Sequence, residues 1–159
     1  MRKTFINTLI EIAEEDKDIY LLTGDLGFNV LEPFMNKFQD RFINAGIGEA
    51  NMVSVATGIA LRGKKAFAYS ITPFVSFKAI DQIRMASYMN QHIVVVGVGR
   101  GEEYHNAGIS HYDYGANEAM NSFPLTVLKP KTQEEVRRSV IKACKNKGTY
   151  FLSLSVKRI

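Results

Sequence analysis

The chain has 159 residues, of which 46% are hydrophobic and 23% charged, so it can bury one substantial core but not two independent ones. Its net charge of +4 and isoelectric point near 9.2 would suit an anionic partner, yet the basic residues are scattered in short groups such as Lys64-Lys65. Because no stripe of basic residues alternates with aromatic ones, the composition argues against nucleic-acid binding.

Apolar periodicity predicts helices and strands in regular alternation. Helical spacing of apolar residues marks these segments: 3–15, 30–39, 49–62, 74–90, 116–122 and 132–146. Extended apolar runs mark these: 19–22, 41–45, 65–70, 92–98, 125–128 and 149–156. The run HIVVVGV at 92–98 is apolar almost throughout, as in strands buried on both faces of a parallel sheet. We therefore expect one α/β domain over residues 1–159, with an open, mostly parallel six-stranded sheet and helices on both faces.

The compartment is predicted from two features. The opening segment MRKTFINTLIEIAEED is amphipathic and acidic, unlike a secretion signal, and no apolar run approaches membrane-spanning length. A single cysteine, Cys144, excludes an intramolecular disulfide, is typical of a reducing compartment and is expected to fill a helix face. We expect a cytoplasmic protein without a membrane partner.

A polar stretch at 99–115 interrupts the alternation, and long irregular connections in compact domains usually serve a site or are mobile. In open α/β sheets, ligands bind beyond the carboxyl ends of the strands. The loops that follow the first four strands should meet there: TGDLGF, GIGE, ITPFVSF and GRGEEYHNAGISH. Three glycine-rich loops and an aromatic one on a single rim predict a pocket.

Three patterns in these loops resemble known sites only in part. GVGRG at 97–101 has the spacing G-x-G-x-G and no helix start behind it, which favours a turn over a dinucleotide site. GDLG at 24–27 has leucine where a diphosphate–metal motif needs glycine after the acid. His105, His111 and Asp113 lie in one loop but lack the fixed spacing of a metal site, so no metal ligand is assigned to this chain.

Glu49 stands out in FINAGIGEANM because an ionisable acid follows two glycines and an apolar run. One interpretation is electrostatic: a carboxylate in the first turn of a helix is favoured by roughly 0.3–1 kcal/mol. The other is functional. Gly46 and Gly48 allow close approach to the backbone, and an acid among apolar neighbours is suited to sharing a proton with a ligand nitrogen.

The stretch RFINAGIGEANMVSVATGIALRGKKAFAYSITPFVSFKAIDQIR resembles the pyrimidine-binding domain of the transketolase family of thiamine diphosphate enzymes. That family has G-[IV]-x-E-x-N-M, a small-residue helix, an aromatic-bearing loop and a helix near D-Q-[IV]-R. EDKDIYLLTGDLG resembles its opening strand and D-L-G turn, and GISHYDYGANEAMNSFPLTVLKP its G-x-[ST]-H segment. The resemblance extends over about residues 2–156, in order, and implies the thiamine diphosphate-binding fold.

The resemblance implies a catalytic role for Glu49. In this family the matching glutamate hydrogen-bonds N1′ of the cofactor's aminopyrimidine, which favours the imino tautomer and removal of the proton from thiazolium C2. The cofactor then attacks a ketose or 2-oxo acid carbonyl and holds the carbanion formed on C–C cleavage. Transfer of a two-carbon ketol unit from a sugar phosphate or related donor to an aldehyde is the expected reaction, since Ser110-His111 follows the transketolase pattern.

Other residues match by position. Phe74 and Phe77 match aromatic residues that stack on or line the pyrimidine, although core packing would also explain their spacing. The family often has a further aromatic residue where this chain has Ile71. His111 matches a substrate-side histidine, and Asp25 lies in the family-like turn near the thiazolium. A second family histidine falls near Gly99, where His105 is a possible substitute from the loop.

The resemblance covers one domain of an enzyme that divides its cofactor between two. The diphosphate and its Mg²⁺ or Ca²⁺ are held by a domain with G-D-G and a downstream asparagine, oxygen ligands suited to a hard cation. That domain and the family's C-terminal domain are expected to be absent. We therefore expect one subunit of a split enzyme, active only with a diphosphate-binding partner, most simply as an α2β2 heterotetramer.

Several alternatives remain open. The same fold would serve a catalytically inactive scaffold or regulatory partner. The β-type subunits of 2-oxo acid decarboxylases and dehydrogenases, and deoxyxylulose-phosphate synthases, share enough of the pattern to leave the reaction open. A generic nucleotide binder depends only on GVGRG.

Overall fold

The extended apolar runs pair into one parallel sheet in the computed structural model, which describes residues 1–157. Its strands are β1 (Ile19–Thr23), β2 (Phe42–Asn44), β3 (Lys65–Ile71), β4 (Ile93–Val98), β5 (Thr126–Leu128) and β6 (Tyr150–Leu154). In the described chain all six are parallel and lie in the order β2-β1-β3-β4-β6-β5. The predicted sheet is confirmed. The edge strands β2 and β5 are shorter than predicted, and each has one neighbour to pair with.

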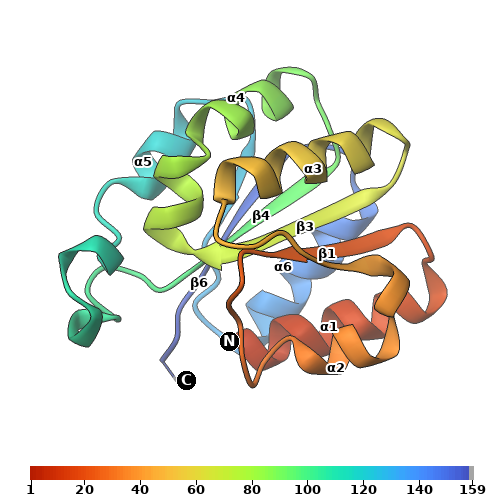
Figure 1. Ribbon diagram of the computed structural model, residues 1–159, viewed down its shortest axis with the longest axis horizontal. Coiled ribbons are helices and arrows are strands. Elements are labelled where there is room, and N and C mark those ends of the chain that lie inside the picture. The colour runs from red at the N-terminus through yellow and green to blue at the C-terminus, as the bar shows by residue number, and fades with distance from the viewer. Residues whose placement is uncertain (158–159) are drawn as a thin grey trace.

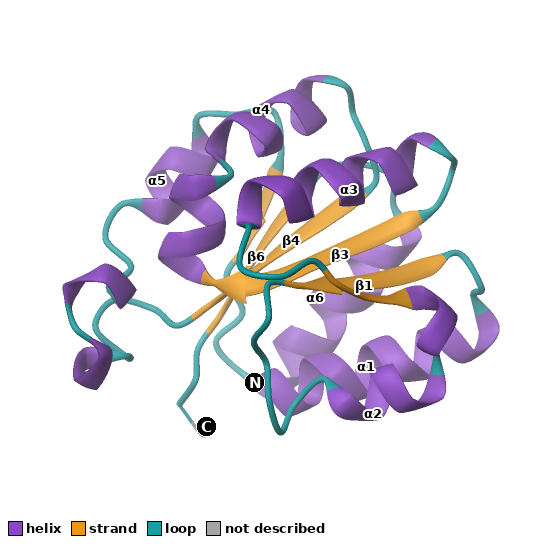
Figure 2. Cartoon of the chain, viewed as in Figure 1, coloured by secondary structure: helices purple, strands orange, loops and turns teal. Residues whose placement is uncertain are grey.

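Helices cover both faces of the sheet, as predicted (Figures 1 and 2). They are α1 (Arg2–Glu15), α2 (Glu32–Lys37), α3 (Glu49–Leu61), α4 (Ile80–Tyr88), α5 (Ala116–Asn121) and α6 (Gln133–Lys145). α1, α2 and α6 lie on one face, and α3, α4 and α5 lie on the other (Figure 1). Successive strand residues serve opposite faces: Leu21 belongs to the apolar cluster under α1, and Leu22 to the one under α3.

Local signals fix the ends of the long helices. Thr132 caps α6 by accepting a hydrogen bond from the Glu135 amide at 3.2 Å. Gly63 follows α3 with a φ of +79°, a left-handed conformation that glycine adopts without strain and that commonly ends a helix. Cys144 is buried on α6, where burial raises the pKa of its thiol to about 12, so its predicted packing role is confirmed.

Two predicted helices differ from the structure. The segment predicted as a helix over 30–39 forms α2 and a separate 3₁₀ turn at Gln39–Arg41. The segment predicted over 74–90 is split into a π-helical turn, Phe74–Lys78, and α4, with a break at Ala79. Apolar periodicity does not reveal such a turn, since a single turn is too short to distinguish π from α spacing. Single π turns occur often at functional sites.

Gly97 in β4 makes room for two neighbours. A Cβ atom built on Gly97 would lie 2.9 Å from Phe151 Cζ and 2.9 Å from Thr72 Oγ1. We expect Gly97→Val to destabilise the fold by about 1–3 kcal/mol, the usual cost of overpacking a well-filled core. Urea unfolding followed by circular dichroism measures this change.

Gly58 is the matched control. It lies in the interior of α3, and a Cβ there would meet nothing within 4 Å. Since glycine in a helix interior costs about 1 kcal/mol relative to alanine, Gly58→Ala should stabilise the protein. If Gly97→Val were as stable as the unaltered chain, the packing of Phe151 and Thr72 against Gly97 would not be tight.

Candidate active site

The loops after β1, β2, β3 and β4 meet at the carboxyl edge of the sheet, as predicted. Asn44 at the end of β2 connects two of them. Its Oδ1 accepts hydrogen bonds from the Asp25 amide at 3.0 Å and the Gly46 amide at 3.1 Å, and its Nδ2 donates to Asp25 Oδ1 at 2.9 Å. The D-L-G turn is thereby fixed against the loop that leads to Glu49. Asp25 has a left-handed φ of +57°, which aspartate tolerates better than most residues.

Glu49 begins α3 directly after Gly48 and is 3% exposed. Its Oε1 accepts a hydrogen bond from the hydroxyl of Ser70, a fully buried residue of β3, at 3.1 Å. Its Oε2 lies 3.7 Å from the ammonium Nζ of Lys78. A simple helix-capping acid would face water. Here one oxygen is anchored to the sheet and the other meets a cation.

The π turn after β3 brings aromatic and charged side chains to Glu49. Phe74 is half-buried, and the Lys78 Nζ lies 4.4 Å from the centre of its ring, within the range of a cation–π contact. The imidazole of His111 meets Phe74 with ring centres 4.8 Å apart and an interplanar angle of 68°. Three loops thus contribute to one cluster: Glu49, Phe74, Lys78 and His111.

The polar stretch 99–115 is anchored where it leaves and re-enters the fold. Glu103 accepts hydrogen bonds from the Ser155 hydroxyl and the Val156 amide, and Gly101 pairs with Asp113 in an isolated antiparallel bridge. Between these anchors it forms two 3₁₀ turns, His105–Ala107 and Ile109–His111. The second turn positions His111, whose Nδ1 lies 3.1 Å from the Ser110 hydroxyl.

The chain as a whole matches a known family. The model of the transketolase pyrimidine-binding domain matches residues 1–158. The chain belongs to this family.

Several of its relatives are transketolase components, and others are 1-deoxy-D-xylulose-5-phosphate synthases. The chain is 29% identical to a subunit of the apulose-4-phosphate transketolase of Phocaeicola vulgatus, over 87% of this chain and 46% of that protein. It is 29% identical to a putative transketolase C-terminal section of Methanocaldococcus jannaschii, over 97% of this chain and 50% of that protein. A split-gene transketolase, solved as an inactive β4 tetramer, has a TM-score of 0.88 at 26% identity, over 99% of this chain and 51% of that one. The chain spans about half the length of these relatives.

Not all the residues that the family resemblance singles out lie together. Glu49, Phe74 and His111 meet through the contacts above, with Gly48 directly before Glu49. Phe77 lies on the same π turn but is 43% exposed. The remaining two residues differ again: the Asp25 carboxylate is bound to Asn44, and the His105 side chain is exposed. The ligand contacts of all these residues stay predictions.

The partial motifs have structural explanations. In GVGRG, Gly97 makes room for Phe151 and Thr72, and Gly99 has a φ of +89° against the ring of Tyr104. Both belong to packing and turning of the chain. Within residues 1–157, no group of three or more His, Cys, Asp or Glu side chains is placed to hold a metal ion. No helix in that range has the length and apolar character to cross a membrane.

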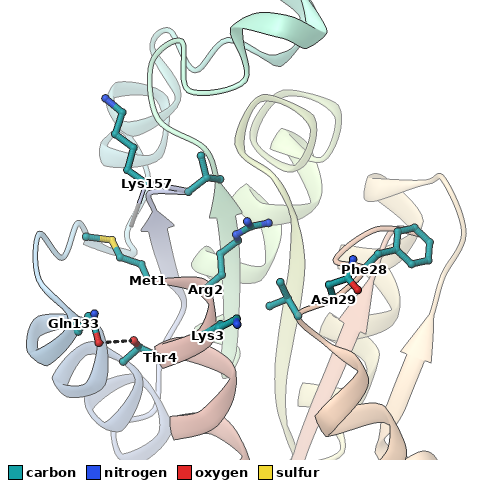
Figure 3. A pocket seen from close by; sticks show the side chains of 10 residues that line it. Met1, Arg2, Lys3, Thr4, Phe28, Asn29, Gln133 and Lys157 are labelled. Carbon is teal, nitrogen blue, oxygen red and sulfur yellow. Dashed lines mark hydrogen bonds between the residues drawn. The ribbon is translucent and has the colours of Figure 1, made fainter. Parts of the chain in front are cut away.

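A second feature of this pyrimidine-domain chain was not predicted from sequence. A cavity of about 660 Å³ opens between the first turn of α1 and the loop carrying Phe28 and Asn29 (Figure 3). Arg2, Lys3 and Lys157 give its wall three cations, and the lining contains no acidic residue. The only sequence signal was a pair of basic residues at the start of an amphipathic helix, which is too common to indicate a site. Such a cavity is suited to an anionic group.

Proposed function

We propose that this chain is the pyrimidine-binding subunit of a split, thiamine diphosphate-dependent transketolase-like enzyme that transfers a two-carbon ketol unit. The observation that carries the proposal is the environment of Glu49. This acid is buried at a helix start, one oxygen is anchored by Ser70, and the other lies in the cluster with Phe74. Family membership and the names of the transketolase components among the relatives support it.

The residues present fit the pyrimidine half of the cofactor. An aminopyrimidine needs a carboxyl oxygen for its ring nitrogen N1′ and an aromatic surface for its face. Glu49 Oε2 and the half-buried ring of Phe74 lie on adjoining loops, and both contact the ammonium group of Lys78. When bound, thiamine diphosphate supplies a carbon nucleophile and an electron sink. Glu49 holds or receives a proton at Oε2, and the Ser70 hydroxyl keeps the carboxyl plane in place.

The other half of the cofactor needs a second chain. Phosphate oxygens and a Mg²⁺ or Ca²⁺ ion require a set of oxygen ligands, which a G-D-G…N subunit would supply. Two exposed apolar side chains lie near Glu49: Ile47 (83% exposed) is two residues before it in the sequence, and Phe77 (43% exposed) is on the π turn. Exposed apolar side chains of this kind are suited to burial against a partner. The structural relative described as an inactive β4 tetramer is in keeping with a chain that is incomplete by itself. An α2β2 assembly in the cytoplasm is our proposal.

His111 and the cationic cavity support a proposal for the substrates. His111, which makes a T-shaped contact with Phe74, would contact the hydroxyls or the reacting carbonyl of a sugar. The cavity with Arg2, Lys3 and Lys157 opens at the same end of the sheet and would take the anionic end of a sugar phosphate. We therefore propose a phosphorylated ketose as donor and an aldehyde as acceptor.

Calorimetry and kinetics test the proposal. This chain, a G-D-G…N partner and their mixture are titrated with thiamine diphosphate and Mg²⁺, and each is assayed with phosphorylated and unphosphorylated ketoses. We expect weak or no binding and no turnover by the chain alone. The mixture should bind tightly and prefer the phosphorylated donor.

Each other outcome has a meaning. Turnover by the chain alone would contradict the split-subunit proposal. Tight binding by the mixture without turnover of any ketose would favour an inactive scaffold. Turnover of 2-oxo acids in place of ketoses would favour a role in a decarboxylase or dehydrogenase.

A further inference from the structure

Lys78 lies in the cluster but was given no role by the sequence. Its Nζ is 3.7 Å from Glu49 Oε2 and 4.4 Å from the centre of the Phe74 ring. The ammonium group therefore lies between the carboxylate and the aromatic face. Its side chain is 56% exposed, whereas that of Glu49 is 3% exposed, so Lys78 covers the acid from the solvent side.

The same space is what an aminopyrimidine would need. Glu49 Oε1 is bonded to Ser70, so Oε2 is the oxygen left for a ligand nitrogen. A ring that bonds Oε2 at about 2.7–3.0 Å and stacks on Phe74 must enter the gap that the ammonium fills. The ammonium group and an aromatic ring cannot occupy that gap together.

We infer that Lys78 is a placeholder for the cofactor: its ammonium occupies the position of the aminopyrimidine between Glu49 and Phe74 and leaves it when the cofactor binds. This inference rests on the proposed function. Lys78 is thus a positioning residue that acts through Glu49. It keeps a buried acid partnered in the cofactor-free protein, where an unpaired buried charge would be costly.

The displacement is feasible because of where Lys78 is attached. It lies at the end of the π turn on a flexible four-carbon stem that is already more than half exposed, so the ammonium can return to water without movement of the backbone. Because the cofactor must displace Lys78 before it can bind, the apparent affinity for the cofactor is lower than the intrinsic affinity. If Lys78 occupies the gap in about nine of ten molecules, the apparent Kd is about tenfold above the intrinsic one.

Variants of Lys78 test this competition in the complex with the diphosphate-binding partner. Calorimetric titration with thiamine diphosphate and Mg²⁺ should give a Kd about tenfold lower for Lys78→Met, since the competitor is removed. Lys78→Arg keeps a cation there and should stay near the unaltered protein. Lys64→Met is the control, because Lys64 pairs with Asp18 away from the cluster. An unchanged or higher Kd for Lys78→Met would overturn the inference.

A second measurement needs no variant. The unaltered complex is treated briefly with acetic anhydride, with and without thiamine diphosphate and Mg²⁺, and the acetylation of each lysine is measured by mass spectrometry. We expect Lys78 to be labelled faster with the cofactor, because its ammonium is then free in water, while Lys64 is unchanged. Slower labelling of Lys78 with the cofactor would mean that it contacts the ligand, which overturns the inference.

Failure of this inference and failure of the proposed function are distinguishable. If the unaltered complex binds no thiamine diphosphate, both are wrong. If it binds and turns over a ketose, but neither the affinity nor the labelling depends on Lys78 as described, only the placeholder role is wrong.

Discussion

Glu49→Gln, assembled with the diphosphate-binding partner, is expected to lose at least about 99% of the rate of hydrogen–deuterium exchange at C2 of bound thiamine diphosphate. A carboxyl group can share a proton with N1′, whereas a carboxamide of the same shape cannot. Positioned proton transfer contributes about 10²- to 10⁴-fold to rates. Quenched-flow exchange followed by proton NMR measures the effect directly, without dependence on the substrate.

The controls separate chemistry from folding. Ser70→Ala removes the hydrogen bond to Oε1 but leaves the acid, so it should slow exchange by only about tenfold, the effect of one hydrogen bond. Glu14→Gln alters an exposed acid that pairs with Lys37 on the other side of the sheet and should have no effect. Exchange at the normal rate in Glu49→Gln, with the complex intact, would remove Glu49 from the proposed role.

The fold was predictable because its signals are local and repeated. Each strand is an apolar run, and each long helix has apolar spacing; Thr132 caps α6, and Gly63 follows the end of α3. The convergence of the loops followed from a general property of parallel sheets. The prediction failed only in the type of one helical turn and in the exact ends of some elements. The π turn Phe74–Lys78 was predicted as ordinary helix because a single turn is too short for its apolar spacing to differ recognisably from that of an α-helix.

The site was predictable only where a residue stands out by its type. Glu49 did so as a lone acid between glycines and an apolar helix, and His111 by its position in a family pattern. Lys78 and Arg2 did not, since basic residues are common on surfaces and only their surroundings distinguish them. Lys78 becomes informative through two distances, one to the carboxylate of Glu49, which is far away in the sequence, and one to the ring of Phe74 on its own turn.

Phe74 and Phe77 were predicted to line the pyrimidine together, but the structure gives them different environments. Phe74 is half-buried and contacts His111 and Lys78, whereas Phe77 is 43% exposed. Stacking of an aromatic side chain on a base contributes about 1–3 kcal/mol, which corresponds to about 5- to 150-fold in affinity. We therefore expect Phe74→Ala to raise the Kd for thiamine diphosphate in the complex by at least about tenfold.

Phe77→Ala is the matched comparison, since it removes the same side chain from the same turn. Its effect on the Kd should be less than about threefold if Phe77 only covers the rim. It should instead weaken assembly with the partner, which analytical ultracentrifugation measures, because an exposed ring beside the site is suited to burial in the interface. Equal losses of cofactor affinity in the two variants would mean that both rings enclose the pyrimidine. The exposed position of Phe77 would then describe only the chain without its partner.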